Sequence, residues 1–144
     1  MTRPDDAAAG FREGFSSSKA VISSFSKDLG LDKETARKIS CGFGAGMAQT
    51  GNICGAVTGA IMVIGLKCGK AAGGDDAAKE RTYALVQEFI TKFRAKNGSI
   101  NCTELLGYDL SDTHAYAAAR DSGLFLSKCP ALVRDAADIL EKIL

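Results

Sequence analysis

Residues 53–68 read ICGAVTGAIMVIGLKC, and this stretch decides the fold. It lies inside a longer segment, residues 39–66, that contains no charged side chain. Glycine, serine, threonine and asparagine interrupt that segment, and the truly apolar part is shorter than the roughly 20 residues that a bilayer span requires. We therefore interpret the stretch as a buried central helix and expect no association with a membrane.

Small residues recur at intervals of four in this predicted helix. Gly55 and Gly59, together with Ala56 and Ala60, leave one side almost bare of side chains. A neighbouring helix or a cofactor can approach the backbone on that side, and close helix packing is the more common use of such spacing.

Helical periodicity extends through almost the whole chain, and no segment of four or more residues alternates as a strand would. The predicted helices cover residues 16 or 17–29, 33–39 after an Asp32 cap, 53–68, 75 or 76–96, a short segment from 102, 111–122 and 130–144. A glycine-dense passage at residues 41–47 interrupts them. The sequence thus predicts an all-α, compact multi-helix single domain over residues 11–144, with a Gly-rich loop, a central small-residue helix and a flexible N-terminus at residues 1–10.

Composition narrows the class of partner. The 144 residues include 18 basic and 17 acidic side chains with no basic cluster, so a nucleic acid is not an expected partner. The N-terminal residues carry acids and lack the apolar core of a secretory signal, which leads us to expect a cytoplasmic protein. The apolar stripe of the predicted helix 130–144 could also serve a homodimer interface.

Three of the five cysteines, Cys54, Cys102 and Cys129, stand where predicted helices begin. The residues that mark these starts are Asn52, Asn101 and Pro130. Exposed amide groups and the positive end of the helix dipole favour a thiolate there. A thiolate is the form that attacks disulfides and binds metals, whereas a free cysteine is more often a small buried hydrophobe.

Other constellations are weaker. Gly42, Gly44 and Gly46 follow a helix and no P-loop lysine comes after them, so we expect no nucleotide. The single histidine, His114, has no acid or nucleophile placed beside it and is expected at the surface. Cys54 and Cys68 lie about 21 Å apart if they share one helix, so they cannot bind the same small cluster. Cys41, in the glycine-rich loop, could fold back toward Cys54.

Several motifs together resemble the C-GCAxxG-C-C family of redox-active proteins. These motifs are Gly14-Phe15, residues 42–47 (GFGAGM), residues 54–60 (CGAVTGA), Gly98-Ser99-Ile100 with Cys102, residues 105–107 (LLG) and Cys129-Pro130. The resemblance implies an all-helical domain and a candidate site at Cys54, Cys102 and Cys129. The split-Soret cytochromes c form a related branch with haem and an iron–sulfur centre, but this chain has no Cys-x-x-Cys-His motif, so no haem is expected.

The chain departs from the family at one position. Relatives carry an early cysteine two residues after the Gly-Phe pair, where this chain has Ser17. Ser17 or Cys41 would therefore supply the fourth group beside Cys54, Cys102 and Cys129, with Gly44 and Gly55 offering close backbone approach.

Three functions are compatible with this pattern. The leading hypothesis is a redox protein with an iron–sulfur cluster or other thiolate-bound metal that exchanges electrons with an unknown partner. The second is a thiol–disulfide oxidoreductase, in which Cys54 attacks and Cys102 or Cys129 resolves. The third is a helical interaction module with inert cysteines.

Overall fold

The structure, a computed structural model, describes residues 2–74 and 76–144. This part of the chain is all-helical and contains no strand, which confirms the predicted fold class. Its α-helices are α1 (Arg3–Arg12), α2 (Ser17–Ser26), α3 (Lys33–Ile39), α4 (Gly55–Cys68), α5 (Asp76–Asn97), α6 (Cys102–Leu106), α7 (Thr113–Asp121) and α8 (Leu124–Ile143). Two short 3-10 helices, η1 (Lys27–Leu29) and η2 (Cys41–Phe43), follow α2 and α3. None of the helices described is both long and apolar enough to cross a membrane.

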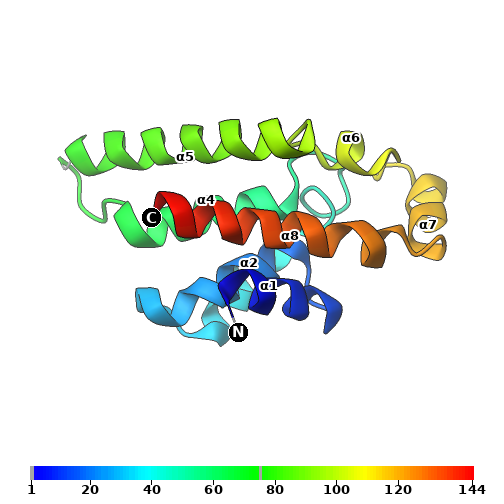
Figure 1. The fold of residues 1–144 in the computed structure, drawn as a ribbon, viewed down its shortest axis with the longest axis horizontal. Helices are drawn as coiled ribbons and strands as arrows, with labels where there is room; N and C mark the ends of the chain where they lie inside the picture. The colour runs from blue at the N-terminus through cyan, green and yellow to red at the C-terminus, as the bar shows by residue number, and fades with distance from the viewer. Residues whose placement is uncertain (1, 75) are drawn as a thin grey trace.

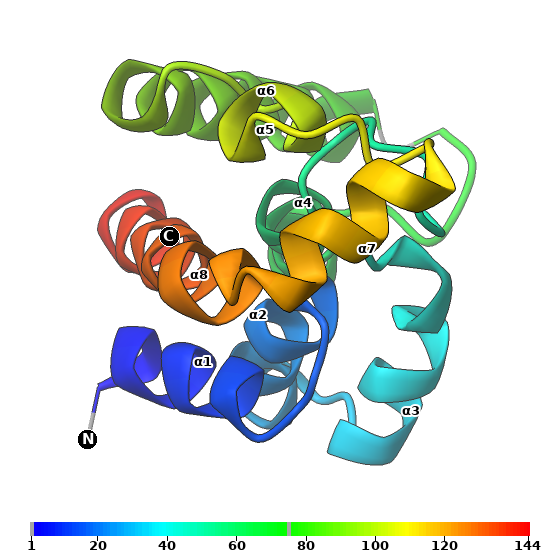
Figure 2. The ribbon, with the colours of Figure 1, turned by 90° about the vertical axis from the view of Figure 1, so that its right-hand side faces the viewer.

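The long helices form three layers. Helices α4 and α8 lie in the middle, α5 covers one side of them, and α1 with α2 covers the other (Figure 1). Seen end-on in Figure 2, α3 lies at the edge beside α2, whereas α6 and α7 gather at the end nearest the viewer. The beginnings of α2, α4, α6 and α8 therefore meet at one end of the molecule.

Helix α4 is held against α2 by its glycines. A Cβ atom on Gly59 would lie 2.8 Å from the backbone oxygen of Ser18 and 3.0 Å from the Cβ of Val21. A Cβ atom on Gly55 would lie 3.0 Å from the backbone nitrogen of Ser18. The bare side of this helix is thus used mainly for close helix packing, and only its first turn faces a cavity.

Predicted helix ends agree with the structure in the first third of the chain. The helix from Ser17 continues through η1 to Leu29 and stops at Gly30, whose φ of 82° is left-handed. Asp32 caps α3 by accepting a hydrogen bond of 2.9 Å from the backbone nitrogen of Thr35. The predicted start of α5 is Asp75 or Asp76; the described helix begins at Asp76, and Asp75 lies outside the described residues.

The N-terminal segment forms a packed helix, although its sequence suggested a flexible end. Residues 1–10 were expected to be flexible, but residues 3–12 form α1, which packs against α8 and α2. Ala7 and Ala8 are fully buried there. The helix starts with a Thr2–Asp5 capping box, and Asp5 also pairs with Arg134 of α8.

The start of the last helix was predicted wrongly. Helix α8 begins at Leu124, not at Pro130, so Cys129 and Pro130 lie in its interior. Gly123 is the N-cap and makes no side-chain capping bond, which left the true start without a sequence signal. The predicted apolar stripe of this helix is buried against α1, α4 and α5 of the same chain.

Candidate functional site

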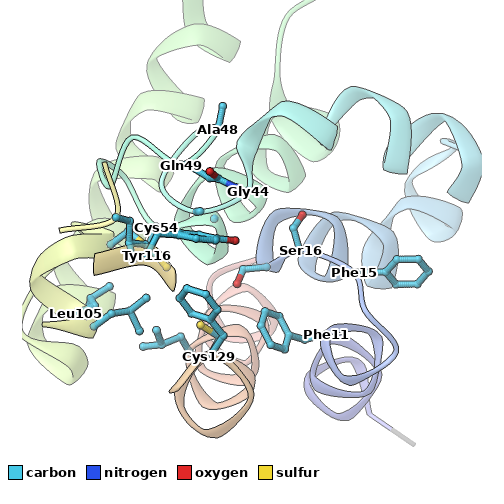
Figure 3. A pocket seen from close by; sticks show the side chains of 18 of the residues that line it. Phe11, Phe15, Ser16, Gly44, Ala48, Gln49, Cys54, Leu105, Tyr116 and Cys129 are labelled. Carbon is cyan, nitrogen blue, oxygen red and sulfur yellow. The ribbon is translucent and has the colours of Figure 1, made fainter. Parts of the chain in front are cut away.

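A cavity of about 530 Å³ lies at the end of the molecule where the helix beginnings meet. All seven residues predicted for the site line it: Ser17, Cys41, Gly44, Cys54, Gly55, Cys102 and Cys129. Figure 3 shows several of them converging from different elements. Cys68, at the far end of α4, and His114, exposed on α7, do not line it.

A short antiparallel pairing brings Cys54 and Cys102 together. The backbone nitrogen of Cys54 donates to the Ile100 oxygen at 2.8 Å, and that of Cys102 donates to the Asn52 oxygen at 2.6 Å. Ile53 and Asn101 form the bridge between these bonds. Since residues on either side of a bridging pair point to the same face, both cysteines face the cavity side.

The local context of each cysteine differs from the prediction in part. Cys102 begins α6 as predicted, because the Asn101 side chain accepts a bond of 3.0 Å from the Glu104 nitrogen. Cys54 is itself the N-cap of α4, and the Asn52 side chain donates to the Thr50 hydroxyl at 3.0 Å instead of capping the helix.

Cys129 reaches the site from the body of α8, one turn before Leu132. It therefore has no helix N-terminus beside it, contrary to the sequence prediction. Pro130 follows it within the helix and lacks the N–H that would bond to the Leu126 oxygen, so the ladder of helix hydrogen bonds is interrupted at the cavity rim.

The three thiols are buried and remain protonated at neutral pH. Cys54, Cys102 and Cys129 are 4 %, 7 % and 8 % exposed. Loss of solvation raises the pKa of Cys102 and of Cys129 to about 12, and it raises the pKa of Cys54 as well. Charge on neighbouring thiols adds to this effect at Cys102 and Cys129, so the three lie within electrostatic reach.

The expected thiolate at helix starts is therefore not found. Backbone amides of Ala56 and Val57 favour the charged form of Cys54, but their effect on its pKa is smaller than that of burial. Three neutral sulfurs of this kind are weak nucleophiles in water.

Ser17 and Cys41 occupy different places around the three thiols. The Ser17 Cβ is 3.1 Å from the position of a Cβ on Gly55, so Ser17 lies against the residue that follows Cys54. Cys41, on η2, is exposed and lines the rim of the cavity. Of the two candidates for a fourth group, Ser17 lies against Gly55, the residue after Cys54, whereas Cys41 lies at the rim.

The glycine-rich segment forms a left-handed turn beside the cysteines. Five successive residues have positive φ values: Ala45 (56°), Gly46 (72°), Met47 (68°), Ala48 (49°) and Gln49 (64°). A non-glycine residue in this conformation costs roughly 1–2 kcal/mol. The Asn52 nitrogen and the Thr50 hydroxyl both donate to the Gly46 oxygen, at 2.9 and 2.7 Å. Strain retained next to buried thiols is typical of a functional site.

Sequence reasoning missed the aromatic and hydroxyl groups of the lining. Phe11, Tyr116 and Phe125 line the cavity, and the rings of Tyr116 and Phe125 are 5.4 Å apart between centroids. In Figure 3, Tyr116 reaches across the cavity with its hydroxyl end toward the Ser16 side. No local sequence motif marks these side chains, and only the packing of their helices places them at the cavity.

The donor set fits a thiolate-bound centre in chemistry but is not preformed for one. In the described part of the chain, no group of three or more His, Cys, Asp and Glu side chains is already arranged to hold a metal ion. Three soft sulfur donors nevertheless share one cavity, and sulfur ligands select iron–sulfur clusters, zinc and copper(I). The sulfurs would have to move closer together to bind one centre.

Comparison with known proteins agrees with the sequence motifs. A family model described as "Putative redox-active protein (C_GCAxxG_C_C)" matches residues 15–143. Searches of curated proteins and of solved structures found no match. The matched range covers nearly the whole chain and includes every cysteine around the cavity, and the chain therefore belongs to this family.

Proposed function

We propose that Cys54, Cys102 and Cys129 hold an iron–sulfur cluster or another thiolate-bound metal, and that the protein transfers electrons through it. The observation that supports this proposal is the convergence of three buried cysteines from α4, α6 and α8 on one cavity. When bound, such a centre would supply one-electron redox chemistry.

The protonation of the cysteines favours a bound centre over thiol–disulfide exchange. Exchange starts from a thiolate, whereas the pKa of Cys102 and of Cys129 is raised to about 12 by burial. A metal ion displaces the thiol protons as it binds, so buried neutral thiols are compatible with metal ligation. We place the protein in the cytoplasm by the same proposal, because thiols are kept reduced there.

Ser17 is the chain's own candidate for the fourth position. It adjoins Gly55 next to Cys54, whereas Cys41 is exposed at the rim. A serine oxygen is a harder donor than a cysteine sulfur, so we expect Ser17 to hold the centre less firmly than a cysteine would.

The cavity lining also predicts a low reduction potential. Thiolate ligands bring negative charge, and no cationic side chain is among the described residues that line the cavity. Adding an electron increases that negative charge without a compensating cation, which disfavours the reduced state. The backbone amides of Ala56 and Val57, which favour the charged form of Cys54, supply positive dipoles at the site.

The test is anaerobic purification followed by analysis of iron, zinc and acid-labile sulfide with a visible absorption spectrum. We expect bound metal in the wild type and its loss in Cys54→Ala. Cys68→Ala is the matched control, because Cys68 belongs to the same helix but lies outside the cavity, and it should keep the wild-type metal content.

A second pair of variants tests the fourth position. Ser17→Cys should raise metal content and slow the loss of metal to a chelator. Ser24→Cys adds a thiol to the same helix away from the cavity and should change neither quantity. A protein without metal in the wild type and in Ser17→Cys would contradict the proposed centre.

A further inference from the structure

The cysteine cavity has no charged side chain in its described lining. Its walls consist of aromatic and aliphatic side chains, glycine and alanine, the cysteines, two serines and Gln49. Unlike a metal ion, which displaces the thiol protons as it binds, an organic ion that entered would lose its hydration without meeting an oppositely charged side chain, which is strongly unfavourable. A small organic ligand of this cavity is therefore uncharged.

The size and the walls of the cavity suit a flat molecule. A volume of about 530 Å³ lies in the usual range for small-molecule sites, about 300–1,000 Å³. Phe11 approaches from α1, and the packed rings of Tyr116 and Phe125 approach from α7 and α8. Aromatic side chains bind flat rings through offset or edge-to-face contacts.

Two hydroxyl groups in the lining are available to bind an oxygen acceptor. The Ser16 hydroxyl is buried and has no hydrogen-bond partner within the described residues, although Ser16 is the N-cap of α2. A serine at this position ordinarily accepts a bond from the helix backbone. The Tyr116 hydroxyl extends toward the same side of the cavity (Figure 3). A buried hydroxyl without a partner is unfavourable, and rotation of the Ser16 side chain toward the cavity would let a ligand carbonyl oxygen satisfy it.

We propose that the cavity binds an uncharged, flat organic molecule with carbonyl oxygens, the chemical class of quinones, beside Cys54 and Cys129. This inference deepens the proposed function, since it gives the redox site a small-molecule partner. Binding depends on the walls and hydroxyl groups of the cavity, so it can be measured whether or not a metal is present.

The experiment is equilibrium dialysis, under anaerobic conditions, of protein with measured metal content. The three probes each have a six-membered carbon ring with four methyl groups. Duroquinone has two carbonyl groups, durene has none, and 2,3,5,6-tetramethylbenzoate is charged. We expect saturable binding of duroquinone, weaker binding of durene, and binding of the anion at least about 10-fold weaker than that of duroquinone.

Variants identify the hydroxyl groups. Ser16→Ala and Tyr116→Phe should each weaken duroquinone binding by about 3- to 10-fold and leave durene binding unchanged, because each removes one hydrogen bond. Tyr83→Phe is the matched control, since Tyr83 is exposed on α5 away from the cavity, and it should change nothing.

A further variant tests the cavity without altering its buried groups. Leu126 lines the rim and is 66 % exposed, so Leu126→Trp should fold and should weaken binding of both neutral probes by narrowing the entrance. Absence of saturable duroquinone binding, equal affinity for the anion, or no response to Ser16→Ala, Tyr116→Phe and Leu126→Trp would overturn the proposal. If the protein purifies without metal but still binds duroquinone, the result contradicts the proposed metal centre and not the proposed ligand.

Discussion

Replacing Gly46 by alanine tests whether the left-handed turn is fitted to the cysteines. An alanine Cβ at this position would lie 2.7 Å from the Asn52 nitrogen and 2.9 Å from the Cβ of Cys102. Real Cβ atoms do not approach other atoms this closely, so either the turn or the Cys102 segment must move. The matched control is Gly30→Ala, because Gly30 also has positive φ but has no atom of the described residues within 4 Å of its added Cβ.

Both variants place an alanine at positive φ, but only Gly46→Ala also creates a steric overlap. An alanine with positive φ costs roughly 1–2 kcal/mol, and the smaller freedom of the unfolded chain offsets about 0.4–1 kcal/mol of that. Gly30→Ala should therefore lower the free energy of unfolding by about 1 kcal/mol. Gly46→Ala adds the overlap with the Asn52 and Cys102 segment, for which overpacked cores suggest about 1–3 kcal/mol more.

Urea denaturation followed by circular dichroism measures both values, and unchanged m-values would confirm that only stability differs. We also expect Gly46→Ala to raise the rate at which Cys102 is alkylated, whereas Gly30→Ala should not. Equal destabilisation by the two substitutions, with equal alkylation rates, would refute the argument that the turn is packed against the site.

Further predictions concern the α2–α4 contact and the thiols. Gly59→Ala should destabilise the protein by about 1–3 kcal/mol relative to Gly65→Ala, and denaturation of the two variants measures this difference. In Gly65→Ala no described atom lies within 4 Å of the new Cβ, so this variant should gain about 0.5–1 kcal/mol from helix propensity. In metal-free protein at pH 8, Cys102 and Cys129 should react with iodoacetamide far more slowly than the exposed Cys41. Burial raises the pKa of each buried thiol from 9.0 to about 12, which lowers its thiolate fraction about 1,000-fold; peptide mass spectrometry would reveal any fast reaction at the buried pair. The same raised pKa means that above pH 9 the unfolded chain binds fewer protons than the folded one, so stability should fall with rising pH between 9 and about 12, by at most about 1.4 kcal/mol per pH unit for each thiol; a flat profile would contradict this.

Periodicity and capping residues predicted most of the fold. Asp32 and Gly30 mark real helix boundaries, and the small-residue spacing of α4 correctly predicted a close neighbour. Two elements escaped prediction for physical reasons. Helix α1 buries mainly alanines, which give a weak apolar signal, and α8 begins at a glycine cap without a side-chain bond, so Pro130 was mistaken for its first residue.

The candidate site was predictable in its residues but not in its electrostatics. Family resemblance pointed to the three cysteines that the cavity gathers, whereas the helix-start argument for them holds in the structure at Cys102 but not with the caps expected at Cys54 and Cys129. Helix-start arguments favoured thiolates, whereas burial dominates and keeps Cys54, Cys102 and Cys129 neutral. Burial depends on how α6, α7 and α8 pack over the cysteines, which no local sequence pattern specifies. The bridge between Ile53 and Asn101 is equally non-local.

The residues that line the cavity lie far apart in the sequence, and this separation determines when the site can form during synthesis. Its lining begins at Phe11 and ends at Leu132, so the enclosure is incomplete until α8 has left the ribosome and docked against α1 and α4. A centre held by Cys54, Cys102 and Cys129 could therefore be completed only after this docking, because Cys129 belongs to α8. Assembly of such a centre would thus be a late step in synthesis, and Pro130 removes one helix hydrogen bond from the part of α8 that carries Cys129.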